Sequence, residues 1–197
     1  MKFLGIVGSM RKQGNTFKLV SAVLEGAKSR NPDISYDILQ ISELNIGPCW
    51  ACYDSCSKES YRCIVEDDLQ AVLKKMEEAQ ALVVGSPLYF PFPSRLVALA
   101  ERLACLAYFF EERGFKTREP LEDKPCGLVA ATGGSDPMPV LQYLSNWALS
   151  LKMKPITVKF YPYFGVAAVG RLEEDGNKPL EKALALGKLL AEAVHQS

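Results

Sequence analysis

Residues 2–16 read KFLGIVGSMRKQGNT, a short apolar stretch that runs into a turn rich in glycine and polar side chains. The apolar residues that follow, Val20, Val23, Leu24 and Ala27, have the spacing of a helix. A strand, a turn of small residues and a helix can cradle phosphate, because backbone N–H groups and the positive end of the helix dipole meet in the turn. We therefore expect an anion at this turn, where nucleotide-type cofactors bind in α/β chains.

The spacing in this turn excludes two common phosphate motifs. A P-loop reads G-x-x-x-x-G-K-[ST], whereas here five residues separate Gly8 from Gly14, and Asn15 follows in place of lysine. Gly5 and Gly8 do not supply the G-x-G-x-x-G fingerprint of dinucleotide binding. The remaining interpretation is a long cradle for the monoester phosphate of a mononucleotide, with an ordinary turn of good capping residues as the alternative.

The composition is that of a globular chain, with 48% hydrophobic and 23% charged residues over 197 positions. Basic and acidic residues number 23 each, which argues against a nucleic-acid or anionic-membrane partner because both need a basic patch. No apolar run approaches the roughly 18 residues of a membrane span, and the first residues do not read as a signal peptide. We expect a single domain over residues 1–197 in the cytoplasm, where six cysteines are more typical of thiols or metal ligands than of disulfides.

Five short apolar stretches, mostly β-branched, alternate with helical patterns along the chain. This alternation predicts βα units, a parallel sheet and helices on both faces of that sheet. Five units favour a flavodoxin-like three-layer α/β sandwich with strand order 2-1-3-4-5 and a ligand at the carboxyl ends of the strands. The expected strands are Phe3–Val7, Ser35–Ile41, Ala81–Gly85, Cys126–Ala131 and Ile156–Tyr161.

Two further loops, after the third and fourth strands, should meet the first turn at this edge of the sheet. Residues 85–94, GSPLYFPFPS, combine three prolines with three aromatic side chains, and a stiff aromatic loop suits a planar ring system. Residues 131–135, ATGGS, carry paired glycines whose N–H groups could face the ring of a reduced flavin. Each loop alone could be a proline-rich turn over the core or a glycine-rich helix entry, but the three together are more specific.

The three loops resemble those of the flavodoxin-like NAD(P)H-dependent FMN reductase family, and the resemblance extends over nearly the whole chain. The matching motifs are Gly8-Ser9-x-Arg11-x-x-Gly14-Asn15-Thr16, Ser86-Pro87-x-Tyr89-Phe90 and Thr132-Gly133-Gly134. The resemblance implies an FMN held by its phosphate, by its isoalloxazine ring and by its pyrimidine edge. The implied residues are Ser9, Arg11, Gln13, Asn15 and Thr16 for the phosphate, Pro87, Leu88, Tyr89 and Phe90 for the ring, and Thr132, Gly133 and Gly134 for the edge.

Where the family usually has a lysine and an Asp-Arg pair in the helix after the second loop, this sequence has Ala98 and Glu101-Arg102. The same helix continues into the aromatic run Tyr108-Phe109-Phe110. An aromatic extension of this kind suggests a contact in a homodimer or homotetramer, with a cap over the core as the alternative.

Four cysteines gather in a cysteine-rich loop, residues 47–66, with the spacing C-x2-C-x3-C-x6-C. Four thiolates on one loop could hold a [4Fe–4S] cluster or a zinc ion, and free or redox-active thiols are a third interpretation. The pattern resembles the compact motif of iron–sulfur flavoproteins, a branch of the same family, which usually has two residues between its second and third cysteines where this chain has three. The candidate ligands are Cys49, Cys52, Cys56 and Cys63, whereas Cys105 and Cys126 are expected in the core.

Together these features predict an FMN-dependent NAD(P)H oxidoreductase. Electrons would pass from a reduced nicotinamide through FMN, and through a [4Fe–4S] cluster if one is bound, to a small-molecule or protein acceptor. The flavin carries the chemistry, so no catalytic side chain is named. The alternatives are a flavodoxin-type electron carrier without NAD(P)H turnover, against which the zero net charge counts, and a cysteine-based sensor.

Overall fold

The computed structural model describes residues 1–56, 58–90, 92–114 and 119–195. Ser57 of the cysteine-rich loop and Pro91 of the aromatic loop therefore lie outside the described residues. The strands are β1 (Lys2–Val7), β2 (Ser35–Gln40), β3 (Ala81–Pro87), β4 (Pro125–Thr132), β5 (Lys154–Pro155) and β6 (Val166–Val169). The helices are α1 (Asn15–Arg30), α2 (Tyr53–Cys56), α3 (Leu69–Glu78), α4 (Ser94–Arg113), α5 (Met138–Ser150) and α6 (Pro179–His195), with a 3₁₀ turn η1 (Ile41–Glu43) after β2.

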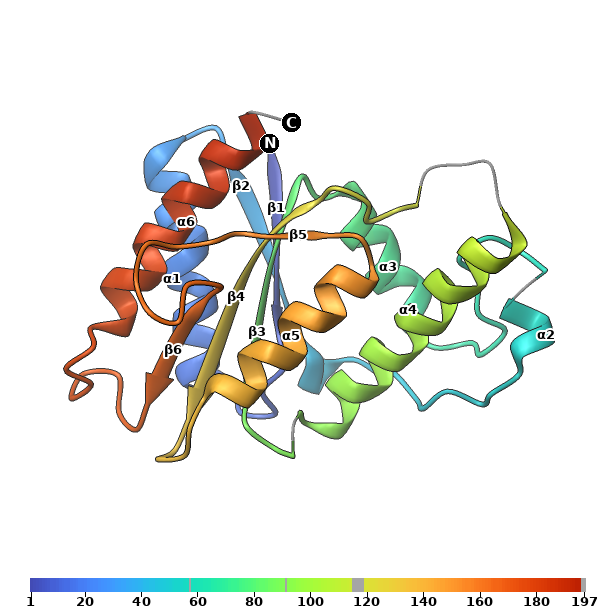
Figure 1. Cartoon of the computed structure of the whole chain (residues 1–197), viewed down its shortest axis with the longest axis horizontal. Helices are drawn as coiled ribbons and strands as arrows, with labels where there is room; N and C mark the ends of the chain where they lie inside the picture. Colours follow the sequence, from blue (N-terminus) through green and yellow to red (C-terminus); the bar gives the residue numbers. More distant parts are fainter. Residues whose placement is uncertain (57, 91, 115–118, 196–197) are drawn as a thin grey trace.

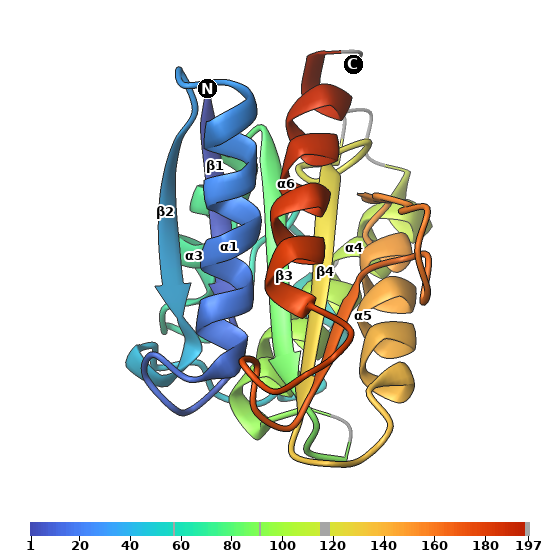
Figure 2. The same cartoon turned by 90° about the vertical axis from the view of Figure 1, so that its left-hand side faces the viewer.

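A parallel sheet forms the middle of three layers. Helices α1 and α6 cover one face, and α3, α4 and α5 cover the other, as Figure 1 and Figure 2 show from two sides. The strand order is β2-β1-β3-β4-β5, with β6 also paired to β4. The flavodoxin-like architecture predicted from the alternating pattern is thereby confirmed, with one strand more than expected.

The additional strand arises because two segments share the edge of the sheet next to β4. Pro125 pairs with Lys154 in β5, and Val129 pairs with Val166 in β6. The fifth strand expected at Ile156–Tyr161 is wrong, because the chain leaves the sheet after β5 and returns at β6. Within this excursion Val158 N–H donates to the Tyr163 carbonyl (2.7 Å), so the backbone here pairs largely with itself.

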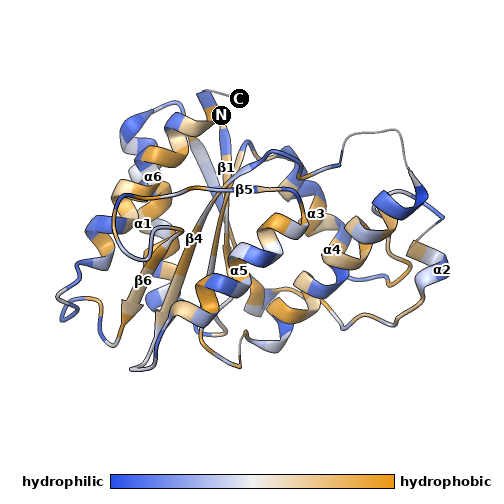
Figure 3. Ribbon diagram, in the orientation of Figure 1, coloured by the Kyte–Doolittle hydropathy of each residue, from blue (hydrophilic) through white to orange (hydrophobic). Residues whose placement is uncertain are grey.

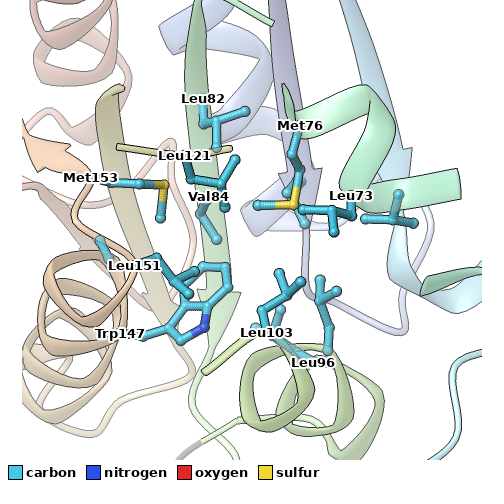
Figure 4. Packing of buried hydrophobic residues seen from close by; sticks show 14 of the residues in the cluster. Leu73, Met76, Leu82, Val84, Leu96, Leu103, Leu121, Trp147, Leu151 and Met153 are labelled. Atoms are coloured by element: carbon cyan, nitrogen blue, oxygen red, sulfur yellow. The ribbon is translucent and has the colours of Figure 1, made fainter. Parts of the chain in front are cut away.

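Two hydrophobic cores lie on the two faces of the sheet, because β3 and β4 are buried along almost their whole length. Figure 3 shows these strands as apolar, whereas the helices carry both apolar and polar residues. In Figure 4, Met76 of α3, Leu103 of α4 and Trp147 of α5 gather around β3. Trp147 is buried in this cluster, and Cys126 is fully buried as expected.

The helix pair α1 and α6 comes into backbone contact at two glycines. A Cβ at Gly187 would lie 1.9 Å from the Val23 carbonyl oxygen, and one at Gly26 would lie 2.2 Å from the Leu184 carbonyl oxygen. This close approach secures the face of the sheet that carries α1, whose first residue borders the cleft described below. Over the described residues, none of the helices combines the length and apolar character needed to cross a membrane.

Candidate functional site

A cleft of about 490 Å³ lies at the carboxyl ends of β1, β3 and β4, where the expected three loops meet. A fourth loop, after β6, also borders it. The structure therefore brings most of the predicted site residues together. The predicted residues that line the cleft are Ser9, Arg11, Asn15, Thr16, Pro87, Leu88, Tyr89, Thr132 and Gly133.

The turn between β1 and α1 is tied to its neighbours by hydrogen bonds. Ser9 Oγ accepts from the Arg11 N–H (3.1 Å), and Gln40 Nε2 donates to the Ser9 and Arg11 carbonyls (3.3 Å each). Gly8 N–H donates to the Gly85 carbonyl (2.7 Å), which joins the turn to β3. These bonds fix the turn at the edge of the sheet.

Helix α1 begins at the cleft without a side-chain cap. Its N-cap residue, Gly14, makes no side-chain hydrogen bond, and its first turn contains no acidic residue. The first N–H groups of any helix lack partners within the helix, so this end favours an anion. Ser9 and Thr16 are buried beside it with hydroxyl groups of the kind that donate to phosphate. The donor set therefore fits a phosphate monoester.

The aromatic loop after β3 presents Pro87, Leu88 and Tyr89 to the cleft, and Leu88 N–H donates to the Ala131 carbonyl (3.3 Å). Phe90, expected against a flavin ring, does not line the cleft, because its side chain is fully exposed (101%). Phe92 instead turns inward and is buried at 8% exposure. Of these two phenylalanines, Phe92 is therefore the one that joins the core.

The loop after β4 offers backbone to the cleft. Thr132 Oγ1 donates to the Ser135 carbonyl (2.5 Å), which fixes the loop, and a Cβ at Gly133 would meet nothing within 4 Å. The backbone of Gly133 is thus accessible to a ligand. Gly134 and Gln13 were also expected at the site, but both are exposed and neither lines the cleft; Gln13 lies at a left-handed turn position with φ 56°.

The fourth loop was not identified from the sequence. Gly170 and Arg171 line the cleft directly after β6. Asn15 Nδ2 donates to the Gly170 carbonyl (2.8 Å), and Gly170 N–H donates to the Thr132 carbonyl (2.8 Å). A signal was present, because Gly170 follows a short apolar run as Gly8 does, and it was missed because the fifth strand was placed too early.

The cysteine-rich segment, residues 47–66, packs against α4, and none of its described residues lines the cleft. Figure 1 shows α2 on the far side of α4 from the sheet. Arg102 of α4 is buried and donates to the Gly47 carbonyl (3.2 Å), to Cys63 Sγ (3.2 Å) and to the Val65 carbonyl (3.4 Å). One arginine therefore holds both ends of the segment.

Two carboxylates complete this attachment. Arg102 forms a buried ion pair with Asp67, and Glu101 Oε1 accepts from the Cys49 N–H (2.7 Å). Burial alone would raise the pKa of Asp67, but hydrogen bonds from Arg102 and from the Gly47 and Leu69 N–H groups hold that pKa below its ordinary value. The Glu101-Arg102 pair thus faces the cysteine segment and not the cleft.

The four loop cysteines lie near one another. Burial raises the pKa of the Cys56 thiol, and the neighbouring Cys52, Cys63 and Cys49 raise it further. Cys105, expected in the core, is half-buried on α4; burial and then contact with Cys49 raise its pKa to about 11. Within the described ranges, no three His, Cys, Asp or Glu side chains are placed to hold a metal ion.

Comparison with known proteins identifies the family. A family model described as NADPH-dependent FMN reductase matches residues 1–162. The chain belongs to this family. It is accordingly an FMN-dependent flavoprotein of the oxidoreductase class.

Individual proteins resemble this flavoprotein in sequence or in three-dimensional structure. An iron–sulfur flavoprotein of Methanocaldococcus jannaschii is 32% identical over 203 residues, covering 98% of this chain and 97% of the relative. The crystal structure of RosB with bound 8-demethyl-8-formylriboflavin-5'-phosphate has a TM-score of 0.71 at 15% identity, over 100% of this chain and 79% of that one. A flavodoxin-type, WrbA-like protein from Agrobacterium tumefaciens has a TM-score of 0.64 at 17% identity, over 99% and 98% of the two chains. The two solved structures establish the shared fold.

Proposed function

We propose that the cleft binds FMN and that the protein is a NAD(P)H oxidoreductase delivering electrons to a small-molecule or protein acceptor. The observation that supports this most is the meeting of the uncapped start of α1, an aromatic loop and an open glycine loop on one cleft. RosB, which shares the fold, is described with a flavin phosphate bound.

Each wall of the cleft has a separate role in this proposal. The phosphate binds to the first turn, where Arg11 adds a positive charge, and the ring lies against the loop after β3. The backbone of Gly133 faces the polar edge of the ring, and the Thr132–Ser135 bond holds that backbone in place. When bound, FMN supplies the hydride and electron chemistry. The assigned residues are Ser9, Arg11, Asn15 and Thr16 for the phosphate, Pro87, Leu88 and Tyr89 for the ring, and Thr132 and Gly133 for its edge.

Anaerobic stopped-flow spectroscopy tests the oxidoreductase proposal. FMN-loaded protein is mixed with NADH or NADPH, and the absorption of the oxidised flavin is followed against an equal concentration of free FMN. Loss of absorption much faster than in free FMN is expected. Protein that binds FMN but is reduced no faster than the free flavin would favour a flavodoxin-type carrier, and protein that binds no FMN would overturn the proposal.

We propose separately that Cys49, Cys52, Cys56 and Cys63 bind a [4Fe–4S] cluster. The support is the set of four thiols on one segment and the name of the archaeal relative. Iron and sulfide analysis of anaerobically purified protein should give about four irons per chain. Zinc at about one per chain, or no metal, would overturn this assignment.

We also propose a cytoplasmic homo-oligomer, assembled through the end of α4. Tyr108 is 61% exposed, and Phe109 contacts the exposed Tyr53 in a tilted ring pair (5.6 Å between ring centroids), so these side chains form an aromatic surface. Phe110, by contrast, is buried against Tyr61 (5.4 Å) and caps the core. Light scattering of Tyr108→Glu against the wild type tests this, because a charge at a subunit contact should shift the protein toward monomer.

A further inference from the structure

Arg171 borders the cleft on a loop beyond residue 162, where the family match ends. It shares the cleft lining with Ser9, Arg11, Asn15 and Thr16, the residues of the phosphate turn. It follows Gly170, whose φ of +74° is a conformation that glycine adopts readily. The turn at Gly170 therefore sets the backbone position of Arg171.

The loop that carries Arg171 is fixed beside the first turn of α1. Gly170 is bonded to Asn15 and to Thr132, both cleft residues (2.8 Å each). Lys18 Nζ pairs with Glu173 Oε1 at 3.0 Å, which attaches the loop further along α1. Asp175 accepts from the Val169 N–H (2.9 Å) and so closes the loop on β6. These contacts hold the loop that carries Arg171 beside the phosphate turn.

The cations near this turn differ in how firmly they are paired. Lys12 pairs with Glu43 (2.6 Å) and Lys18 with Glu173, whereas Arg11 has no acidic partner in the part of the chain that the structure describes. Arg171 pairs with Glu174 (3.0 Å), and both of these side chains are mostly exposed. An exposed ion pair contributes little, so the guanidinium can exchange this partner for a phosphate.

We propose that Arg171 is a second phosphate-binding residue of the cleft, beside Arg11, and that it binds a phosphate monoester. This inference rests on the proposed function, because the monoester is either the 5'-phosphate of FMN or the 2'-phosphate of NADPH. A guanidinium binds phosphate through two parallel charge-assisted hydrogen bonds.

The first arm of the test compares FMN with riboflavin, which lacks only the phosphate. Both are titrated into flavin-free protein by fluorescence for the wild type, Arg171→Gln and Arg30→Gln. Arg30 is the matched control, since it forms an exposed pair with Glu192 (2.8 Å) at the other end of α1. Arg171→Gln should weaken FMN about tenfold and leave riboflavin unchanged, as loss of one charge-assisted bond predicts. Arg30→Gln should change neither.

The second arm measures the KM for NADPH and for NADH with the same variants at saturating FMN. If Arg171→Gln leaves FMN affinity unchanged but raises the KM for NADPH alone, the phosphate belongs to the nicotinamide and the proposal stands. Arg171→Lys should retain part of whichever effect is lost. Unchanged values in both arms would overturn the role of Arg171. A wild-type protein that binds neither flavin would overturn the proposed function itself, and this result needs no variant to be recognised.

Discussion

The cleft and the cysteine segment are held together by different kinds of contact. In the cleft, hydrogen bonds between residues that are close in the sequence shape the loops that follow buried strands. Examples are the bonds from Arg11 N–H to Ser9 Oγ and from Thr132 Oγ1 to the Ser135 carbonyl. The cysteine segment has no described strand. It is attached to α4 by hydrogen bonds with Glu101 and Arg102 and by ring contacts of Tyr53 and Tyr61 with Phe109 and Phe110. The cleft should therefore tolerate single changes locally, whereas the segment should be sensitive to the loss of the buried Arg102, which contacts both of its ends.

The largest expected effect is at that cation. Arg102→Met leaves the Asp67 carboxylate buried without its partner, and it should lower the free energy of unfolding by about 3–5 kcal/mol in a urea titration. The double variant Arg102→Met/Asp67→Leu should recover most of this loss, because no charge is then buried. Arg30→Met is the control, and its exposed pair should be worth about 1 kcal/mol or less. If Arg102→Met lowered the free energy of unfolding by no more than the control does, the ion pair with Asp67 would not be a main stabilising contact of the segment.

The pH dependence of the same ion pair sharpens the comparison. The pKa of Asp67 is lower in the folded protein than in the unfolded chain. The ionised carboxylate therefore stabilises the fold above the unfolded pKa of about 3.9, and this stabilisation is lost as the pH falls through the folded pKa. The difference in unfolding free energy between the wild type and Asp67→Asn should therefore be largest near neutral pH and should shrink in acid. The exposed Asp33→Asn is the control. A difference that stays constant into acid would contradict the assignment.

In the cleft, a single change should alter ligand binding more than stability. Thr16→Val removes a buried hydroxyl at the start of α1 and should weaken FMN about tenfold in a fluorescence titration. The exposed Thr157→Val serves as control and should leave FMN binding unchanged. Equal effects of the two substitutions would remove the phosphate role of Thr16.

The smallest expected effect is at Phe90 of the aromatic loop, compared with Leu88 of the same loop. Phe90→Ala should change FMN affinity by less than about twofold, because the side chain is exposed and outside the cleft. Leu88→Ala should weaken FMN more, since Leu88 lines the cleft. If Phe90→Ala instead has the larger effect in calorimetric titrations, Phe90 contacts the bound flavin. That result would support the expectation from the sequence that Phe90 lies against the ring.

The amino-acid sequence alone determined the architecture and most of the cleft lining. Strands buried on both faces must be apolar runs, and helices on a sheet must repeat their apolar residues every three to four positions. The order of these patterns implies a parallel sheet, and a parallel sheet implies a site at its carboxyl edge. The sequence could therefore predict that the loops after β1, β3 and β4 meet at this edge, and the family resemblance supplied the individual residues Ser9, Asn15, Thr16 and Thr132, which line the cleft.

Only the tertiary structure decided which distant segments meet. The apolar alternation at Ile156–Tyr161 is real, but β4 pairs with β5 and β6 instead, and so Gly170 and Arg171 reach the cleft. Periodicity also does not reveal that Arg102 binds Cys63, or that Cys105 contacts Cys49. These contacts join residues 39 or more positions apart, and their formation depends on how whole helices pack, which no local pattern in the sequence records.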